Sequence, residues 1–340
     1  MPYIKLSLLF ISLTLYVSIA YSADDQSCLS KNYTLDFDYS SQLRESTLDL
    51  TGYTVCAVPG QNGLGSSRQY VAQILGVSPD IVEQVTTPLG SINSPDLGQS
   101  VCIKHLKSAI DQKDNVIIHA TSQGTATTLN YCAMLSAAEQ SKIKAIILEA
   151  VLASGNSAIM HTVTGPLMGW NSVESAPGSR YVVPYAAKAV YPRYWPAGKQ
   201  PIKSIADICS DVPIIIMHSK KDQQLSFKDA QALYYGLRSH GNNNVYFVPF
   251  EGYDHISICD RHPEKKELVK KILRTQLDLA GEKLTSEEKQ QYQPDPKALR
   301  KTYEDLLTQE QNHETIGYVS AAASTALVGA SLYYRSCSIL

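Results

Sequence analysis

Two kinds of hydrophobic pattern alternate along the middle of the chain. Short runs that are apolar at successive positions are typical of strands buried on both faces. They occur at residues 51–60, 115–120, 143–151, 212–219 and 244–250, with a less regular candidate at 80–88. Between them, apolar residues recur every three or four positions, which predicts amphipathic helices. These segments are 66–77, 96–111, the stretch after Ser122, and 263–281.

This alternation predicts an α/β fold, with a mostly parallel central sheet covered by helices on both faces. One interval breaks the rhythm. Residues 152–211 contain six prolines and many aromatic residues, including Trp170 and Trp195. The interval is too long for a simple connection between a strand and the next helix, so we expect it to be an inserted cap.

The N-terminus has the layout of a secretory signal peptide. Lys5 is followed by an apolar run from Leu6 to Ala20, and then by small and acidic residues. Cleavage after Ala20 and cleavage near Ser22 both fit, so we expect residues 1–22 to be removed. An uncleaved anchor is the alternative, but the run is short for a membrane span. The folded domain is then expected at residues 23–281, in the secretory pathway, secreted or held at a membrane.

The C-terminal region changes character twice. Residues 282–315 are polar and are expected to form a helical stalk or linker. Residues 316–334 carry no charge over nineteen positions, which is long enough for a transmembrane helix. This run is rich in Ala, Ser and Gly, so an Ala-rich helix docked on the domain is the alternative. Cys337, near the end of the chain, is a candidate for lipid attachment.

Charge and cysteine content narrow the choice of partners. The formal net charge is −2 and there is no basic stripe, so we expect no binding to nucleic acid. A secreted chain is permitted disulfides. Six cysteines fall in the expected mature domain, and their pairing is not determined by the sequence. They are Cys28, Cys56, Cys102, Cys132, Cys209 and Cys259.

The chemistry centres on the segment Ala120–Gly124. Ser122 lies between a buried strand and a helix, and the residues two before and two after it are small. A nucleophile on a sharp strand-to-helix turn requires this spacing, because strand and helix pack closely there. The simpler interpretation is that Ser122 only caps the helix. Asp222 and His255 each follow a later strand, in the order expected for a catalytic triad.

From about Tyr53 to Gly281 the chain resembles the α/β-hydrolases, on the nucleophile segment and on "MHSKKDQQLSF" and "GYDHISI". The resemblance implies that Ser122 is the nucleophile, His255 the base and Asp222 the acid. Glu149 stands where some members place an alternative acid. It also implies that the cap lies between the sixth and seventh core strands.

The resemblance further implies an oxyanion hole of two backbone N–H groups. One is that of Gln123, directly after the nucleophile. The other follows the first strand, at Gln61 or Asn62, and Gln61 is our choice. We expect His119, within a strand, to be a core histidine and not the base.

Together these residues indicate a serine hydrolase that cleaves a carboxylic ester through an acyl-enzyme on Ser122, with lipid-like esters among the candidate substrates. Peptidase and thioesterase activity would use the same residues. A non-catalytic domain of this fold, acting as a binding ectodomain, is the second hypothesis. No His, Asp or Glu grouping has the spacing of metal ligands, and we expect neither a metal nor another cofactor.

Overall fold

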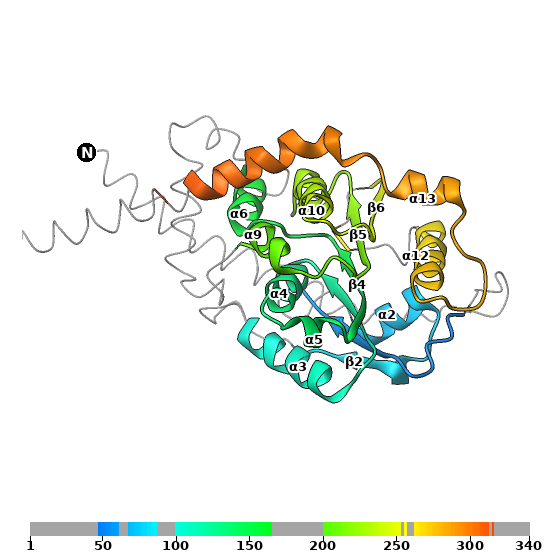
Figure 1. Ribbon diagram of the computed structural model, residues 1–340. Coiled ribbons are helices and arrows are strands. Elements are labelled where there is room, and N and C mark those ends of the chain that lie inside the picture. The colour runs from blue at the N-terminus through cyan, green and yellow to red at the C-terminus, as the bar shows by residue number, and fades with distance from the viewer. Residues whose placement is uncertain are drawn as a thin grey trace, which may run out of the picture. The chain divides into compact units, whose positions relative to one another are not determined.

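The computed structural model describes residues 47–60, 67–86, 99–164, 200–252, 255–256, 262–312 and 315. Within these ranges the chain builds an α/β domain around one sheet (Figure 1). The expected signal peptide (1–22), most of the cap, and the expected membrane helix (316–334) lie outside them. These expectations therefore stay predictions.

All pairings in the six-stranded sheet are parallel, in the order β2-β1-β3-β4-β5-β6. The strands are β1 (Thr54–Val58), β2 (Val82–Gln84), β3 (Val116–Thr121), β4 (Ile143–Glu149), β5 (Ile214–Ser219) and β6 (Val245–Phe250). Every residue of β3 and of β5 is buried. A parallel sheet has helices on both faces, which is why its central strands are apolar at every position.

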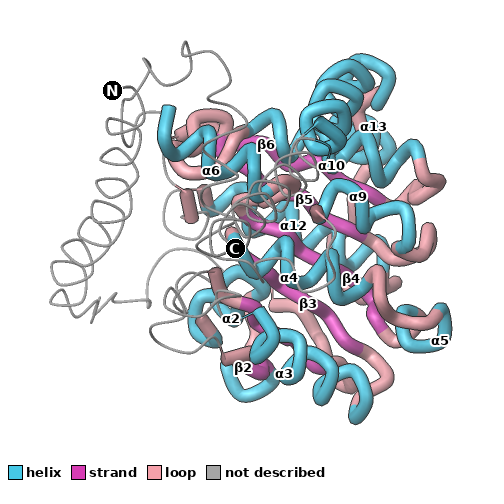
Figure 2. Tube along the Cα trace, turned by 90° about the vertical axis from the view of Figure 1, so that its left-hand side faces the viewer, coloured by secondary structure: helices cyan, strands magenta, loops and turns pink. Residues whose placement is uncertain are grey.

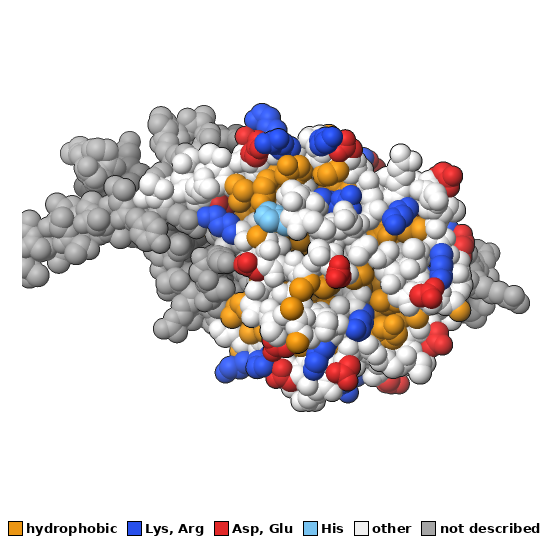
Figure 3. Space-filling model, viewed as in Figure 1, with side chains coloured by type: hydrophobic (Ala, Val, Ile, Leu, Met, Phe, Trp, Pro, Cys, Tyr) orange, Lys and Arg blue, Asp and Glu red, His pale blue; other side chains and the backbone are white. Residues whose placement is uncertain are grey.

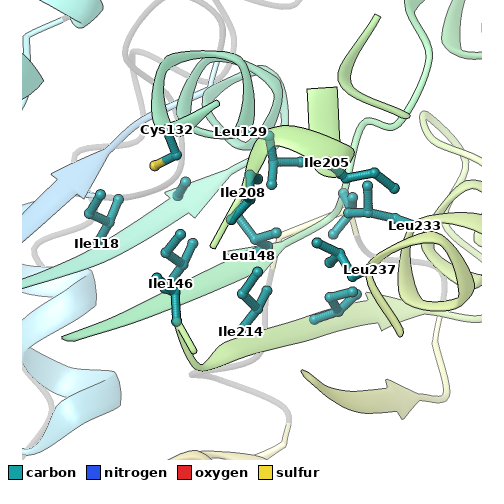
Figure 4. Close-up of a cluster of buried hydrophobic side chains, with 14 of the residues drawn as sticks. Ile118, Leu129, Cys132, Ile146, Leu148, Ile205, Ile208, Ile214, Leu233 and Leu237 are labelled. Carbon is teal, nitrogen blue, oxygen red and sulfur yellow. The ribbon is translucent and has the colours of Figure 1, made fainter. Parts of the chain in front are cut away.

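Helices cover both faces of the sheet, as Figure 2 shows. On one face lie α3 (Gln99–Gln112), α4 (Gln123–Cys132) and α10 (Phe227–Ser239). On the other lie α2 (Arg68–Leu75) and α12 (Pro263–Gln276). Successive residues of one strand serve the two cores. Ile118, for example, belongs to the first core, shown in Figure 4, and Ile117 to the second.

Each strand and helix predicted between residues 51 and 281 is present in the described ranges, with ends shifted by a few residues. Gly76 ends α2 in the left-handed region, with φ 65°, as its place at the end of the predicted helix suggested. Four elements were not predicted from the sequence. They are α10, the short helix α5 (Ala137–Gln140) and the 3₁₀ turns η2 (Pro79–Ile81) and η4 (Ile205–Asp207). Among the described strands, the expected cap interval lies between the fourth and the fifth, β4 and β5. Its place between a sixth and a seventh core strand of the whole fold stays a prediction.

Only the two ends of the expected cap are described. After β4 the chain forms α6 (Gly155–Thr164), and before β5 it forms α9 (Pro201–Ser204). The Gly155 N–H donates to the side-chain oxygen of Gln200 at 2.8 Å, so the two ends of the interval meet. The aromatic residues of the interval, Trp170 and Trp195 among them, lie outside the described residues.

The polar segment 282–315 is helical, as predicted, but its described residues pack against the domain and do not form a stalk. The segment contains α13 (Ser286–Tyr292), η5 (Pro296–Leu299) and a helix over 300–312. The last helix, orange in Figure 1, passes over α10 and ends beside α6. Leu306 joins the core, and the ring of Tyr303 lies 5.1 Å from that of Tyr235. A few apolar residues on one face are enough to dock a polar helix.

Glu310 makes the second attachment of this helix, by polar contacts. Its carboxylate accepts hydrogen bonds from the Ser154 hydroxyl and, at 2.6 Å, from the side-chain amide of Asn156. Both groups stand at the start of α6, and Glu310 is only 1% exposed. Asp229 of α10 is buried nearby and accepts from the Ser157 hydroxyl at 2.7 Å.

Two buried carboxyl groups this close do not both ionise readily. Burial raises the pKa of Asp229 to about 7; the hydrogen bond from Ser157 opposes this shift, and the charge of Glu310 adds to it. Asp229, which joins α10 to α6, thus holds a proton near neutral pH close to the place where the C-terminal helix meets α6.

On the face seen in Figure 3, cationic and anionic side chains are interspersed. Among the described residues, ion pairs one helical turn apart join Lys107 to Asp111 and Lys301 to Asp305. No helix among the described residues is long and apolar enough to cross a membrane.

Four of the cysteines are described. Cys56, Cys132 and Cys209 are free thiols, and burial raises the pKa of both Cys56 and Cys132 to about 12. The Cys102 thiol lies 3.7 Å from the carbonyl oxygen of Thr86. Cys28 and Cys259 lie outside the described residues, so whether the chain forms disulfides, and with which pairing, stays open.

The buried carboxyl group gives a pH dependence whose sign is fixed. Asp229 keeps its proton in the folded state up to about pH 7, whereas the unfolded chain releases it near pH 4. The free energy of unfolding should therefore fall as the pH rises from 4 to 7, by at most about 1.4 kcal/mol per pH unit, and then level off. Asp229→Asn should flatten this slope in urea unfolding measured from pH 5 to pH 8.

The control is Asp114→Asn, since the Asp114 side chain is 92% exposed. This variant should keep the wild-type slope. Equal slopes for Asp229→Asn and the wild type would show that Asp229 ionises in the folded protein as it does in water.

Candidate active site

The candidate residues come together where parallel strands end. The strand order reverses at β1, because β2, the next strand along the chain, lies on one side of β1 and β3 lies on the other side. Ligand sites of open parallel sheets lie at such a switch point, outside the carboxyl ends of the strands. Ser122 directly follows β3, Asp222 follows β5, and His255 follows β6. All three therefore leave the sheet at the same edge.

Ser122 has a strained backbone. Its φ is 51° and its ψ is −124°, in a region that glycine adopts readily and other residues rarely. The turn is held on both sides, because the Ser122 N–H donates to the carbonyl oxygen of Glu149 and the Thr125 N–H donates to that of Ser122. The Ser122 side chain makes no capping bond to α4. This geometry does not support the interpretation of Ser122 as a simple helix cap.

The small residues around Ser122 are required by close packing. A Cβ atom on Gly124 would lie 2.5 Å from the carbonyl oxygen of Pro59 and 2.6 Å from that of Val58. Real Cβ atoms do not come so close to a backbone oxygen, so only glycine lets α4 approach the end of β1. Ala120, on the strand side, is completely buried.

The three side chains form one chain of hydrogen bonds. His255 Nε2 lies 2.8 Å from Ser122 Oγ, and His255 Nδ1 lies 2.8 Å from Asp222 Oδ2. A carboxylate only accepts, so Nδ1 carries the proton and donates it to Asp222, which leaves Nε2 to accept from the Ser122 hydroxyl. The Asp222 side chain is buried, and that of His255 is 12% exposed.

The acid is held ionised by its surroundings. Burial raises the pKa of Asp222, but the hydrogen bond from His255, the electrostatic effects of the His255 and His218 rings and the Leu225 N–H outweigh it, so the pKa is lowered. The other carboxylate oxygen accepts from the N–H groups of Gln224 and Leu225, at 2.7 and 2.9 Å. The loop thus fixes one oxygen and leaves the other for His255.

Glu149, the alternative acid, is engaged elsewhere. Its carboxylate accepts from the hydroxyl of Tyr70, at 2.7 and 2.9 Å from the two oxygens, and lies 3.7 Å from Nε2 of His119. Both His119 and Glu149 are completely buried. Burial lowers the pKa of His119 to about 3, so this imidazole is neutral. The structure therefore places Asp222, and not Glu149, beside His255.

Of the two expected oxyanion donors, Gln123 is described and Gln61 is not. Gln123 is the first residue of α4, where backbone N–H groups point out of the helix. Gln61 and its alternative Asn62 lie outside the described residues. Pro59, two residues before Gln61, lies against Gly124.

Two further histidines approach Asp222, and neither was predicted to do so. His161 of α6 lies 3.1 Å from the backbone oxygen of Asp222 through its Nε2. His218, the fifth residue of β5, places its Nε2 3.7 Å from Asp222 Oδ2. The spacing from His218 to Asp222, four residues across a strand end, was the only signal available in the sequence.

No protein-family model matches the sequence, and no curated protein matches it. Solved structures do resemble the fold at low identity. An esterase from a Rhodococcus species is 12% identical, with 67% of this chain and 93% of that chain covered and a TM-score of 0.43. The monoacylglycerol lipase of Paleococcus ferrophilus is 13% identical, with 68% of this chain and 96% of that chain covered and a TM-score of 0.41. The acylaminoacyl peptidase of Pyrococcus horikoshii is 14% identical, with 72% of this chain and 40% of that chain covered and a TM-score of 0.45.

The assignment to a fold class rests on the chain itself. A parallel sheet with helices on both faces carries a serine on a strained turn after a central strand, and an aspartate and a histidine after later strands. This is the α/β-hydrolase fold.

The strain at Ser122 has a measurable consequence. Ser122→Gly should be more stable than Ser122→Ala by about 1 kcal/mol, because glycine adopts this backbone geometry at little cost and alanine does not. Urea unfolding of the two variants gives the difference.

Ser108, in the middle of α3, supplies the control. There the order should reverse, with Ser108→Ala more stable than Ser108→Gly by about 1 kcal/mol, since glycine weakens a helix interior. Should alanine be the more stable residue at both positions, the turn at Ser122 would be unstrained.

Proposed function

We propose that the protein is a serine hydrolase that cleaves a carboxylic ester through an acyl-enzyme intermediate on Ser122. The observation that supports this most directly is the continuous hydrogen-bond chain from Ser122 through His255 to Asp222, with the serine on a strained turn. A hydroxyl that donates to an imidazole, itself oriented by a buried carboxylate, is arranged for nucleophilic attack.

In this mechanism Ser122 Oγ attacks the acyl carbon while His255 Nε2 takes its proton. The same proton is then given to the leaving alcohol, and the acyl group stays on Ser122. Water attacks in the second half, with His255 again as the base, and the acid is released. Asp222 keeps the imidazole in the required tautomer and stabilises it when it is protonated.

The negative charge that develops on the acyl oxygen requires donors. We assign these to the backbone N–H of Gln123 and to that of Gln61 in the turn after β1. The N-terminus of α4 adds the positive end of the helix dipole at the same place. The packing of Pro59 against Gly124 supports this assignment, since it brings the end of β1 next to α4.

An ester is our preferred substrate because the expected cap, residues 152–211, is aromatic and apolar and could line an acyl pocket. Peptides and thioesters are the alternatives, because the same triad cleaves both. A non-catalytic binding ectodomain is the competing hypothesis. It is weakened by the presence of all three residues in hydrogen-bonding geometry.

A fluorophosphonate probe should label the wild type on Ser122, and p-nitrophenyl esters of short and long acids should be hydrolysed. Ser122→Ala should remove both reactions, and Asp222→Asn should lower kcat by about 10⁴-fold while the protein stays folded. Ser108→Ala serves as the matched serine control. Unchanged hydrolysis in folded Ser122→Ala, or no labelling of the folded wild type, would exclude the proposal.

We also propose that the mature protein enters the secretory pathway and that residues 316–334 hold it at a membrane. The layout of residues 1–22 and the uncharged C-terminal run support this. Expressed in a eukaryotic cell, the chain should begin near residue 23 by N-terminal sequencing and should stay in the membrane pellet after carbonate washing. Removal of residues 316–340 should release it, and retention of the shortened chain would contradict the anchor.

A further inference from the structure

His218 is a buried histidine that the proposed mechanism does not use. It lies at the end of β5, with no exposed surface, between the segment that follows β4 and the loop that carries Asp222. Burial lowers its pKa to about 4, against the opposing effect of the Asp222 charge. The ring is therefore neutral at physiological pH.

The neighbours of His218 determine which nitrogen carries the proton. The backbone N–H of Val151 donates to Nδ1 at 2.9 Å, so Nδ1 is an acceptor and bears no hydrogen. The proton is then on Nε2, which lies 3.3 Å from the backbone oxygen of Leu225 and 3.7 Å from Asp222 Oδ2. The ring accepts from one segment and directs its N–H toward the other.

The segment after β4 is itself tied to the nucleophile. The N–H of Leu152, next to Val151, donates to the Thr125 hydroxyl at 3.0 Å. That hydroxyl donates to the backbone oxygen of Ser122 at 2.6 Å. A buried path of hydrogen bonds thus runs from Ser122 through Thr125 and the segment after β4 to His218.

On the far side of His218 the path reaches the acid. Asp222 Oδ1 is fixed by its own loop, and Oδ2 faces both His255 Nδ1 at 2.8 Å and His218 Nε2 at 3.7 Å. His161 of α6 meets the backbone oxygen of Asp222, and Phe227 of α10 packs beside the His218 ring. The charged or titratable groups around Oδ2 are thus His255, His218 and His161.

We propose that His218 is a positioning residue for the triad. It fixes the loop of Asp222 relative to the turn of Ser122, and its uncharged N–H, which donates to the Leu225 oxygen, lies 3.7 Å from the carboxylate oxygen that binds His255. This inference rests on the proposed function. The distance between nucleophile and acid is set through this ring, so that one His255 imidazole spans both at 2.8 Å.

Three variants separate the two contacts of the His218 ring, the one at Nδ1 with Val151 and the one at Nε2 toward the Asp222 loop. His218→Phe keeps the volume and removes both contacts. His218→Asn keeps an acceptor where Nδ1 stands and loses the contact toward the Asp222 loop. His218→Gln restores an N–H at the position of Nε2. His240→Phe, at the exposed end of α10, is the control for replacing a histidine.

With p-nitrophenyl butyrate, kcat should fall by about ten- to a hundredfold in His218→Phe and His218→Asn, with KM nearly unchanged. The acidic limb of the pH–rate profile should move to higher pH, because the carboxylate then faces one N–H fewer. His218→Gln should restore the position of the acidic limb but only part of kcat, because it leaves the Val151 N–H without its acceptor. His240→Phe should show neither effect.

A readout that needs no substrate keeps this test apart from that of the proposed function. The proton that His255 donates to Asp222 should give a far-downfield ¹H NMR signal in the wild type. This signal should move or broaden in His218→Phe and return in His218→Gln. If it is unchanged in all His218 variants, or if they only lower Tm without moving the pH profile, His218 is a core residue and the proposal fails. If the signal changes in the His218 variants but the wild type shows no Ser122-dependent hydrolysis, the proposed function is overturned and the positioning role is not.

Discussion

The close approach of α4 to the end of β1 is the constraint on which the rest of the site depends. It exists because Gly124 has no side chain where the backbone oxygens of Val58 and Pro59 stand. The same approach leaves Ser122 no relaxed backbone conformation between strand and helix, so the serine is held out at the sheet edge. There it meets the histidine and the aspartate carried by the other strands, and the first turn of α4 lies against the end of β1.

Two pairs of a carboxylate and an imidazole lie near this turn, on the same sheet. His119 and Glu149 are fully enclosed beside Tyr70, whereas His255 and Asp222 stand at the strand ends with the imidazole partly open to solvent. The groups are alike, and their surroundings make them different. An enclosed imidazole cannot readily take a proton, and only the partly open one reaches the Ser122 hydroxyl.

Much of this was predictable because the pattern is local. The central strands are apolar at every position, and Ser122, Asp222 and His255 each follow a strand in the order that the fold requires. What was missed depends on contacts between distant segments. The polar composition of residues 282–315 indicated a stalk. The few apolar residues that pack against the domain, such as Leu306, have little effect on that composition. Equally, nothing local in β5 showed that His218 would face the loop of the acid four residues later.

The last helix has a consequence for the order of folding. Ser154 and Asn156, at the start of α6, bind a carboxylate that lies more than 150 residues further along the chain, since Asn156 and Glu310 are 154 positions apart. During synthesis from the N-terminus, the sheet and the three residues of the site are therefore complete before the polar start of α6 has its partner. A chain that ends before Glu310 would leave Ser154 and Asn156, at the start of α6, without their carboxylate partner and open to water.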